Sequence, residues 1–300
     1  MSHTSIHAAS RSRTGSLLRV MAVYLLALAA GGAVAVATEG WGALESAALA
    51  DVAATLVVFL GSRWYDNTSL YDAYWSVAPP FLLLWFVVHP GAVGVELPNG
   101  GNTLRLLLLG VPLLAWALRL TWNWARGWHG LHEEDWRYAD FRRLGWLYWP
   151  LSLFGLHLFP TVQVFLGMVP AAWAAREASP PGALAWLGAA VVTGAVILQG
   201  VADEQLRRFV ARGEKAAVLR EGLWARSRHP NYLGEIGVWL GVLLAGIDAG
   251  APPWAAAGSV AITAMFVFVS IPLMERRQLA KRPDYQRVVD EVPMLLPRLG

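Results

Sequence analysis

The chain has 300 residues, of which 56% are hydrophobic and only 15% charged, and it carries a net charge of +3. This composition excludes an ordinary soluble domain, because apolar runs recur along the whole chain as they do in polytopic membrane proteins. The absence of cysteine excludes disulfides, thiolate metal sites and cysteine nucleophiles. We assign the basic excess to arginine in cytoplasmic loops and not to nucleic-acid binding.

Residues 1–16 are polar, and we expect a disordered N-terminal segment there. The first apolar run covers about 17–37. Its small residues at 33–37 also suit a signal-peptide cleavage site, but the many later runs favour a retained first span. The transmembrane region is expected to extend over 17–275, and a basic amphipathic tail follows at 276–300. The later apolar runs are roughly 47–62, 71–88, 103–124, 145–175, 183–200, 233–247 and 254–275.

The run at 145–175 is too long for one perpendicular span, and it contains Pro150, Pro160 and Pro170. It could form one tilted and kinked helix or two short ones. The distribution of Lys and Arg favours one helix, because eight spans then place nearly all of these cations on the same side. We therefore predict an all-α bundle of about eight transmembrane helices with both termini in the cytoplasm.

Asp72 lies at the edge of the third run, directly after Tyr71. A carboxylate in such a position is a functional candidate, because desolvation raises its pKa and a neutral acid can donate a proton or polarise a carbonyl. The alternative is that Asp72 caps the helix at the membrane border.

Arg119, Asn123 and Arg126 recur at spacings of four and three near the end of the fourth run, so they share one helical face. Arg119 lies one turn inside the apolar run and needs an anionic partner or a ligand. Asp72 is one candidate for that partner.

Asp203 and Arg207 lie four residues apart just after the sixth run. This spacing suits an ion pair on a helix surface, and it equally suits a ligand site. The histidines show no metal-ligand spacing, so we expect no metal site. His157 lies in an apolar run and is expected to be hydrogen-bonded within the bundle.

Residues 222–235 read GLWARSRHPNYLGE and lie between two apolar runs. Pro230 suits the first turn of a helix, whose free N–H groups bind anions, and Arg226 and Arg228 beside it suit phosphate. Asn231 and Glu235 share a helical face, and a carboxylate that far into a span is not expected to face lipid. The alternative is a basic loop at the membrane border with a capping proline.

Small residues follow this stretch at Gly234, Gly237 and Gly241, at spacings of three and four. They allow close helix packing or the approach of a cofactor, and packing is the favoured interpretation. No G-x-G-x-x-G sequence follows a strand pattern, which excludes a soluble dinucleotide-binding domain. A cofactor would therefore lie among the transmembrane helices.

The stretch resembles the signature W-x-x-S-R-H-P-N-Y-x-G-E of the steroid 5-alpha-reductase family and of related bacterial membrane proteins. A shorter pattern, R-H-P-x-Y-x-G, is shared with isoprenylcysteine and phospholipid methyltransferases. Asn231 and Glu235 favour the reductase side. The matching residues are Trp224, Ser227, Arg228, His229, Pro230, Asn231, Tyr232, Gly234 and Glu235.

The resemblance implies NADPH and the reduction of an activated carbon–carbon double bond in a lipophilic molecule. It implies that Asp72, with Tyr71 or Arg119, polarises the carbonyl or supplies a proton. Trp116 aligns where steroid reductases have a tyrosine, so a steroid substrate is not assumed. The residues implied to hold the dinucleotide are Asp203, Arg207, Arg226, Arg228, His229, Asn231, Tyr232, Glu235 and Glu275.

Two other functions are consistent with the sequence. One is a lipid or prenyl methyltransferase that uses S-adenosylmethionine and needs no proton donor at Asp72. The other is a non-catalytic membrane binding protein. The resemblance also implies a multi-pass protein of the bacterial inner membrane, with a lipophilic substrate and the bilayer as partners. The substrate, the oligomeric state and the choice between NADPH and NADH stay open.

Overall fold

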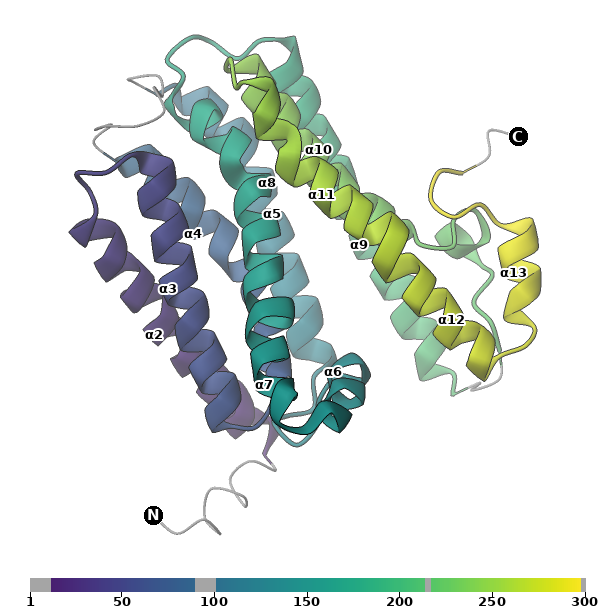
Figure 1. The fold of residues 1–300 in the computed structure, drawn as a ribbon. Helices are drawn as coiled ribbons and strands as arrows, with labels where there is room; N and C mark the ends of the chain where they lie inside the picture. Colours follow the sequence, from purple (N-terminus) through teal and green to yellow (C-terminus); the bar gives the residue numbers. More distant parts are fainter. Residues whose placement is uncertain (1–11, 90–100, 214–216, 298–300) are drawn as a thin grey trace.

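The computed structural model describes residues 12–89, 101–213 and 217–297, and every regular element in these ranges is a helix (Figure 1). The predicted all-α class is confirmed. The first half contains α2 (Arg13–Ala37), α3 (Ala43–Trp64), η1 (Thr68–Tyr71), α4 (Tyr74–Val88), α5 (Thr103–Gly127), α6 (Trp136–Phe141), η2 (Arg142–Leu147), α7 (Tyr148–Leu151), η3 (Ser152–Leu158) and α8 (Phe159–Arg176). The second half contains α9 (Ala183–Ala211), η4 (Gly222–Ala225), α10 (Pro230–Asp248), η5 (Pro253–Ala256), α11 (Ala257–Met265), η6 (Phe266–Ser270), α12 (Ile271–Lys281) and α13 (Tyr285–Glu291).

Seven helical stretches in the described ranges are long and apolar enough to cross a membrane, so the chain is an integral multi-pass membrane protein. The third expected run differs from the other seven. It forms α4, which has 15 residues, contains Pro79 and Pro80, and is about 22 Å long. The first helix begins at Arg13, before the expected start of the span, and residues 1–11 of the predicted N-terminal segment lie outside the described residues.

The ambiguous run at 145–175 belongs to one continuous helical stretch, 136–176, which supports the single-span interpretation. Gly145 interrupts it with φ 59° and ψ −121°, a backbone conformation that suits glycine. A π-helical segment, η3, ends just before Pro160, and a second one, η6, ends just before Pro272. Proline cannot donate to the preceding turn, and the wider π turn absorbs that loss within a continuous helix.

Helices α9 and α10 pack closely against each other along their glycines. A Cβ atom at Gly234 would lie 2.4 Å from Gln199 Cγ, and one at Gly241 would lie 2.4 Å from Val192 Cγ2. These distances are shorter than any tolerated contact, so the packing interpretation of the glycines is confirmed. This close contact fixes the position of α10, and of the signature residues at its start, along α9.

The start of α2 and the end of α5 lie together at one end of the bundle, and α12 lies beside α6. Arg13, at the start of α2, donates to Ala125 O near the end of α5 at 2.7 Å. The guanidinium of Arg277, on α12, lies 3.6 Å from the ring centroid of Trp136, on α6. Figure 1 shows this end at the bottom, with α6 there and α12 to its right. Its assignment to the cytoplasm stays a prediction from the charge pattern.

Candidate functional site

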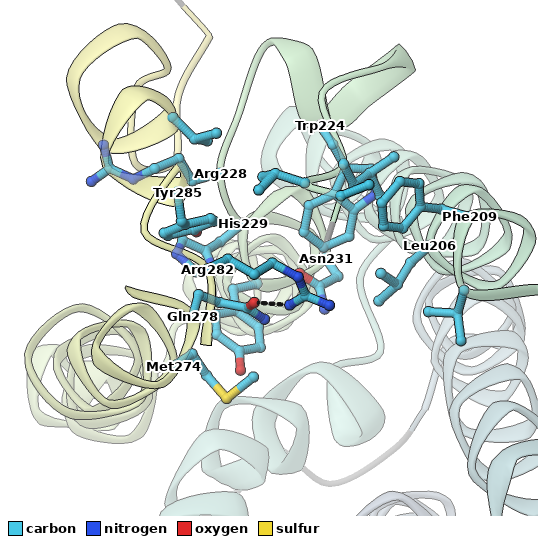
Figure 2. A pocket seen from close by; sticks show the side chains of 16 residues that line it. Leu206, Phe209, Trp224, Arg228, His229, Asn231, Met274, Gln278, Arg282 and Tyr285 are labelled. Atoms are coloured by element: carbon cyan, nitrogen blue, oxygen red, sulfur yellow. Dashed lines mark hydrogen bonds between the residues drawn. The ribbon is translucent and has the colours of Figure 1, made fainter. Parts of the chain in front are cut away.

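A cavity of about 220 Å³ lies between α9, the signature loop and the tail helices (Figure 2). Side chains of α9 and the segment before η4 form an apolar wall. Residues of the signature and of α12 and α13 form a more polar wall. The lining residues are Leu206, Phe209, Val210, Ala217, Val218, Leu219, Trp224, Arg228, His229, Asn231, Tyr232, Met274, Gln278, Arg282, Tyr285 and Val288.

Glu275 holds Arg228 and His229, the two side chains at the centre of the signature. Its Oε1 accepts from Arg228 Nε at 2.7 Å and lies 2.9 Å from His229 Nε2. The sequence predicted that these side chains bind an anion, and in the structure that anion is the carboxylate of Glu275. Arg226 is exposed and does not line the cavity, so the predicted phosphate site of two arginines is not assembled.

Arg228 also ties the signature loop to the tail. Its Nη1 donates to Val289 O and Val292 O, each at 2.8 Å, and its backbone N donates to Pro293 O at 3.0 Å. Tyr285 from α13 completes the cavity wall, and burial raises the pKa of its phenol to about 12. Arg228 thus positions the tail, which is a role that a spacing pattern could not show.

Asn231 gives the cavity its unsatisfied polar atom. Its Oδ1 is buried and has no hydrogen-bond partner among the described residues, while its backbone oxygen accepts from Gln199 Nε2 at 3.4 Å. A buried amide oxygen without a donor costs free energy, and a ligand with an N–H or O–H group would recover it. Beside it, Tyr232 stacks on His229 with 5.4 Å between ring centroids.

Arg119 finds its anionic partner on α9. It donates to Asp203 Oδ2 at 2.7 Å and to Gln199 Oε1 at 2.6 Å, so the suggested pairing with Asp72 is wrong. The suggested pair of Asp203 with Arg207 is also wrong, because Arg207 bonds to Glu204 on the helix surface. The pair of Asp203 with Arg207 followed from helical spacing, but the partner of Asp203 comes from another helix.

Glu235 lies inside the bundle and accepts hydrogen bonds from three side chains. The donors are Trp116 Nε1 at 3.0 Å, Trp239 Nε1 at 3.1 Å and Gln199 Nε2 at 2.6 Å. The expectation that Glu235 avoids lipid is confirmed, since the residue is 4% exposed. Trp116, which aligns with a tyrosine of steroid reductases, therefore binds this carboxylate. Through Gln199, the network supports the backbone of Asn231.

Asp72 lies between η1 and α4 and accepts a hydrogen bond of 2.5 Å from Tyr138. It does not cap α4, because Ala73 occupies the N-cap position. Burial raises the pKa of Asp72 to about 7, although the Arg137 guanidinium and the Tyr138 hydroxyl act in the opposite direction. Near neutral pH the carboxyl group can therefore hold or release a proton.

Tyr71 points into a different part of the bundle from Asp72. Its hydroxyl lies 2.7 Å from Thr161 Oγ1, and its ring lies 5.0 Å from that of His157. His157 bonds to Ser62 and to Ser152 O, which confirms its expected place inside the bundle. Tyr71, Asp72 and Arg119 thus have separate partners, and the structure does not bring the three together.

Residues 133–138 connect Asp72 with the tail. Glu134 accepts from the backbone N of Thr68 at 2.8 Å and from Tyr148 at 2.9 Å, which fixes the segment against η1. Two residues on, Trp136 meets Arg277 of α12, and Tyr138 meets Asp72. Residues 133–138 thus contact both the candidate acid, Asp72, and α12, which lines the cavity.

Several cavity residues were missed by the sequence analysis. Met274 and Gln278 lie four residues apart on α12, so their common face could have been recognised from spacing, and Arg282 follows as the residue that caps this helix. Tyr138 carries no signal that identifies Asp72 as its partner. Among the described residues, no group of three or more His, Cys, Asp and Glu side chains is placed to hold a metal ion.

The fold defines a polytopic α-helical membrane protein, and the cavity lies between the signature and the helices that follow it. The chain belongs to the DUF1295 family, described as proteins of unknown function, whose family model matches residues 58–292. It is also 27% identical over 268 residues to the uncharacterized protein C594.04c of Schizosaccharomyces pombe, which covers 79% of this chain and 75% of the yeast protein. No solved structure matches the chain.

Proposed function

We propose that the chain is a membrane-embedded reductase that uses NADPH to reduce an activated carbon–carbon double bond in a lipophilic molecule. The observation that carries the proposal is the cavity beneath the signature, which is lined by Asn231, a residue whose buried Oδ1 has no partner among the described residues. The resemblance of residues 222–235 to the steroid 5-alpha-reductase signature, where Asn231 is one of the discriminating residues, supports the same function.

The cavity has the chemistry that a dinucleotide needs. Asn231 Oδ1 would accept from an amino or carboxamide group, and Trp224 and Tyr232 offer flat faces to a ring. Arg282 places a cation on the same wall, as Figure 2 shows, which suits a phosphate. When bound, the dinucleotide supplies a hydride to the β-carbon of the substrate.

Asp72 is the proposed acid of the reaction. Hydride addition to an enone leaves negative charge on the carbonyl oxygen, and a proton must reach the product to balance that charge. Burial raises the pKa of Asp72 to about 7, so part of the population carries a proton near neutral pH, and the Tyr138 hydroxyl fixes the orientation of its carboxyl group. Arg119 and Glu235 act through the helix network that supports Asn231, and Tyr71 packs inside the bundle.

The first test is a ligand titration of the detergent-purified full chain with NADPH, NADH and S-adenosylmethionine, followed by thermal stability. A ligand at about 100 times its dissociation constant adds about 2.7 kcal/mol of stability. We expect NADPH to stabilise the protein and Asn231→Ala to weaken its binding about tenfold, because one hydrogen bond is lost. Arg282→Gln should weaken the binding of NADPH more than the binding of NADH.

Thr193→Ala provides the matched control, because Thr193 is exposed on α9 and bonds only to a carbonyl of its own helix. It should bind NADPH as the wild type does. If S-adenosylmethionine alone stabilised the protein, the result would favour the methyltransferase function over the reductase function. No stabilisation by any of the three would leave the non-catalytic binding protein as the better description.

A further inference from the structure

A second cavity, of about 200 Å³, lies among α2, α3 and α4, away from the signature. Small side chains create the space, and larger apolar side chains of α4 enclose it. The lining residues are Leu28, Gly31, Gly32, Ala35, Ala47, Ala50, Asp51, Ala54, Tyr74, Ala78, Phe81, Leu82, Leu84, Trp85 and Val88. None of these residues belongs to the cavity beneath the signature.

The cavity reaches the lipid-facing surface of the bundle. Phe81, Leu84 and Val88 of α4 are 48%, 56% and 59% exposed, and Gly32 of α2 is exposed as well. Apolar side chains exposed on membrane-spanning helices contact lipid. A molecule dissolved in the bilayer can therefore enter between α2 and α4 without crossing water.

Asp51 is the unexpected residue of this cavity. It lies within the span of α3 and is 5% exposed, and its Oδ2 has no hydrogen-bond partner among the described residues. A carboxyl group inside a membrane span is costly and is expected to serve a ligand or a partner group. Trp85, across the cavity on α4, has a buried Nε1 that also lacks a partner there.

We propose that this cavity binds a lipophilic molecule that carries a hydroxyl group, with Asp51 as the residue that recognises it. A hydroxyl both donates and accepts, so it satisfies the carboxyl oxygen in either protonation state and can also accept from an indole N–H. The rest of the wall is apolar and suits a hydrocarbon body. The inference does not depend on the proposed reductase activity.

The test measures saturable binding of tritiated 1-dodecanol to the full chain in lipid nanodiscs, with empty nanodiscs subtracted. Dodecyl methyl ether and dodecane compete as matched probes, because the ether only accepts a hydrogen bond and the alkane makes none. We expect unlabelled dodecanol to compete about tenfold better than either. In Asp51→Asn, the affinity for dodecanol should fall about tenfold while the two other probes keep their weak competition.

Gly32→Leu tests the location. A Cβ atom there meets nothing within 4 Å, so the variant should fold, and its side chain should narrow the opening between α2 and α4. Gly32→Leu should weaken the binding of all three probes. Gly194→Leu is the matched control, since its Cβ also meets nothing within 4 Å but lies on α9. Equal competition by alcohol, ether and alkane, or unchanged dodecanol binding in Asp51→Asn, would overturn the proposal.

Discussion

Tyr138 donates a 2.5 Å hydrogen bond to Asp72 across 66 residues of sequence. The bond joins the turn before α4 to the helix that follows α5, so the orientation of the candidate acid depends on a distant segment. A hydroxyl donor favours the charged form of its carboxylate partner, whereas burial favours the neutral form. The balance places the pKa of Asp72 at about 7.

Asp72 should make the stability of the protein depend on pH. Its pKa rises from 3.8 to about 7 on folding, so the folded state binds the proton more tightly. The stability due to this group is complete below about pH 4 and is lost as the pH rises to about 7, amounting to at most about 4 kcal/mol. Between pH 5 and 8, the melting temperature should fall several degrees more for the wild type than for Asp72→Asn. Parallel curves would contradict the assignment.

Tyr138→Phe should move the same transition to higher pH. The variant removes the hydroxyl that lowers the pKa of Asp72, so the carboxyl group loses its proton later. The midpoint in the pH dependence of the melting temperature should rise measurably. Tyr148→Phe is the control, because Tyr148 bonds to Glu134 in the same segment and not to Asp72. A midpoint that moves equally in both variants would show a general loosening of the segment.

Glu275→Gln should release the tail from the signature loop. The carboxylate holds Arg228 and His229, whose side chains are 12% and 8% exposed, and its loss leaves a nearly buried guanidinium without its anion. Removing one partner of such a pair costs roughly 3 kcal/mol. Hydrogen exchange should speed up in residues 285–292. Glu204→Gln removes an exposed pair and should leave the melting temperature nearly unchanged, because solvent screens such pairs.

Gly241→Ala should separate α9 from α10. The added methyl would lie 2.4 Å from Val192 Cγ2 and 2.7 Å from Gly188 O, and backbone cannot move aside easily. We expect a loss of about 1–3 kcal/mol, seen as a lower melting temperature. Gly194→Ala, with no atom within 4 Å, should be neutral or slightly stabilising because alanine favours the helix. Equal effects of the two substitutions would argue against the close contact.

The sequence was sufficient for the features that depend on local pattern. Apolar runs located the seven long helices, and the spacing of Gly234, Gly237 and Gly241 indicated the packed face of α10. The burial of Glu235 followed from the cost of a carboxylate in lipid. These inferences need only the period of a helix and the properties of the bilayer.

The partners of charged groups could not be predicted in the same way. Helical spacing shows which residues share a face, but it does not show which helix that face meets. Arg119 was given Asp72 as a candidate partner, and the fold gives it Asp203. Asp51 could not be predicted as a site residue from its run, because one acidic residue among alanines does not interrupt an apolar pattern. Its significance comes from the cavity, which only the packing of α2, α3 and α4 creates.

The cavity beneath the signature has walls that are synthesised at different times. Trp224 precedes the last two spans and Asn231 lies in the first turn of the earlier one, whereas Tyr285 and Val288 follow every span in the described ranges. The ribosome must therefore deliver all the hydrophobic helices to the membrane before the chain can close this site. During biogenesis, water hydrates the guanidinium of Arg228 until the carbonyls of Val289 and Val292 have been synthesised. A nascent chain arrested before α13 would contain every long apolar helix of the described ranges but would lack one wall of this cavity.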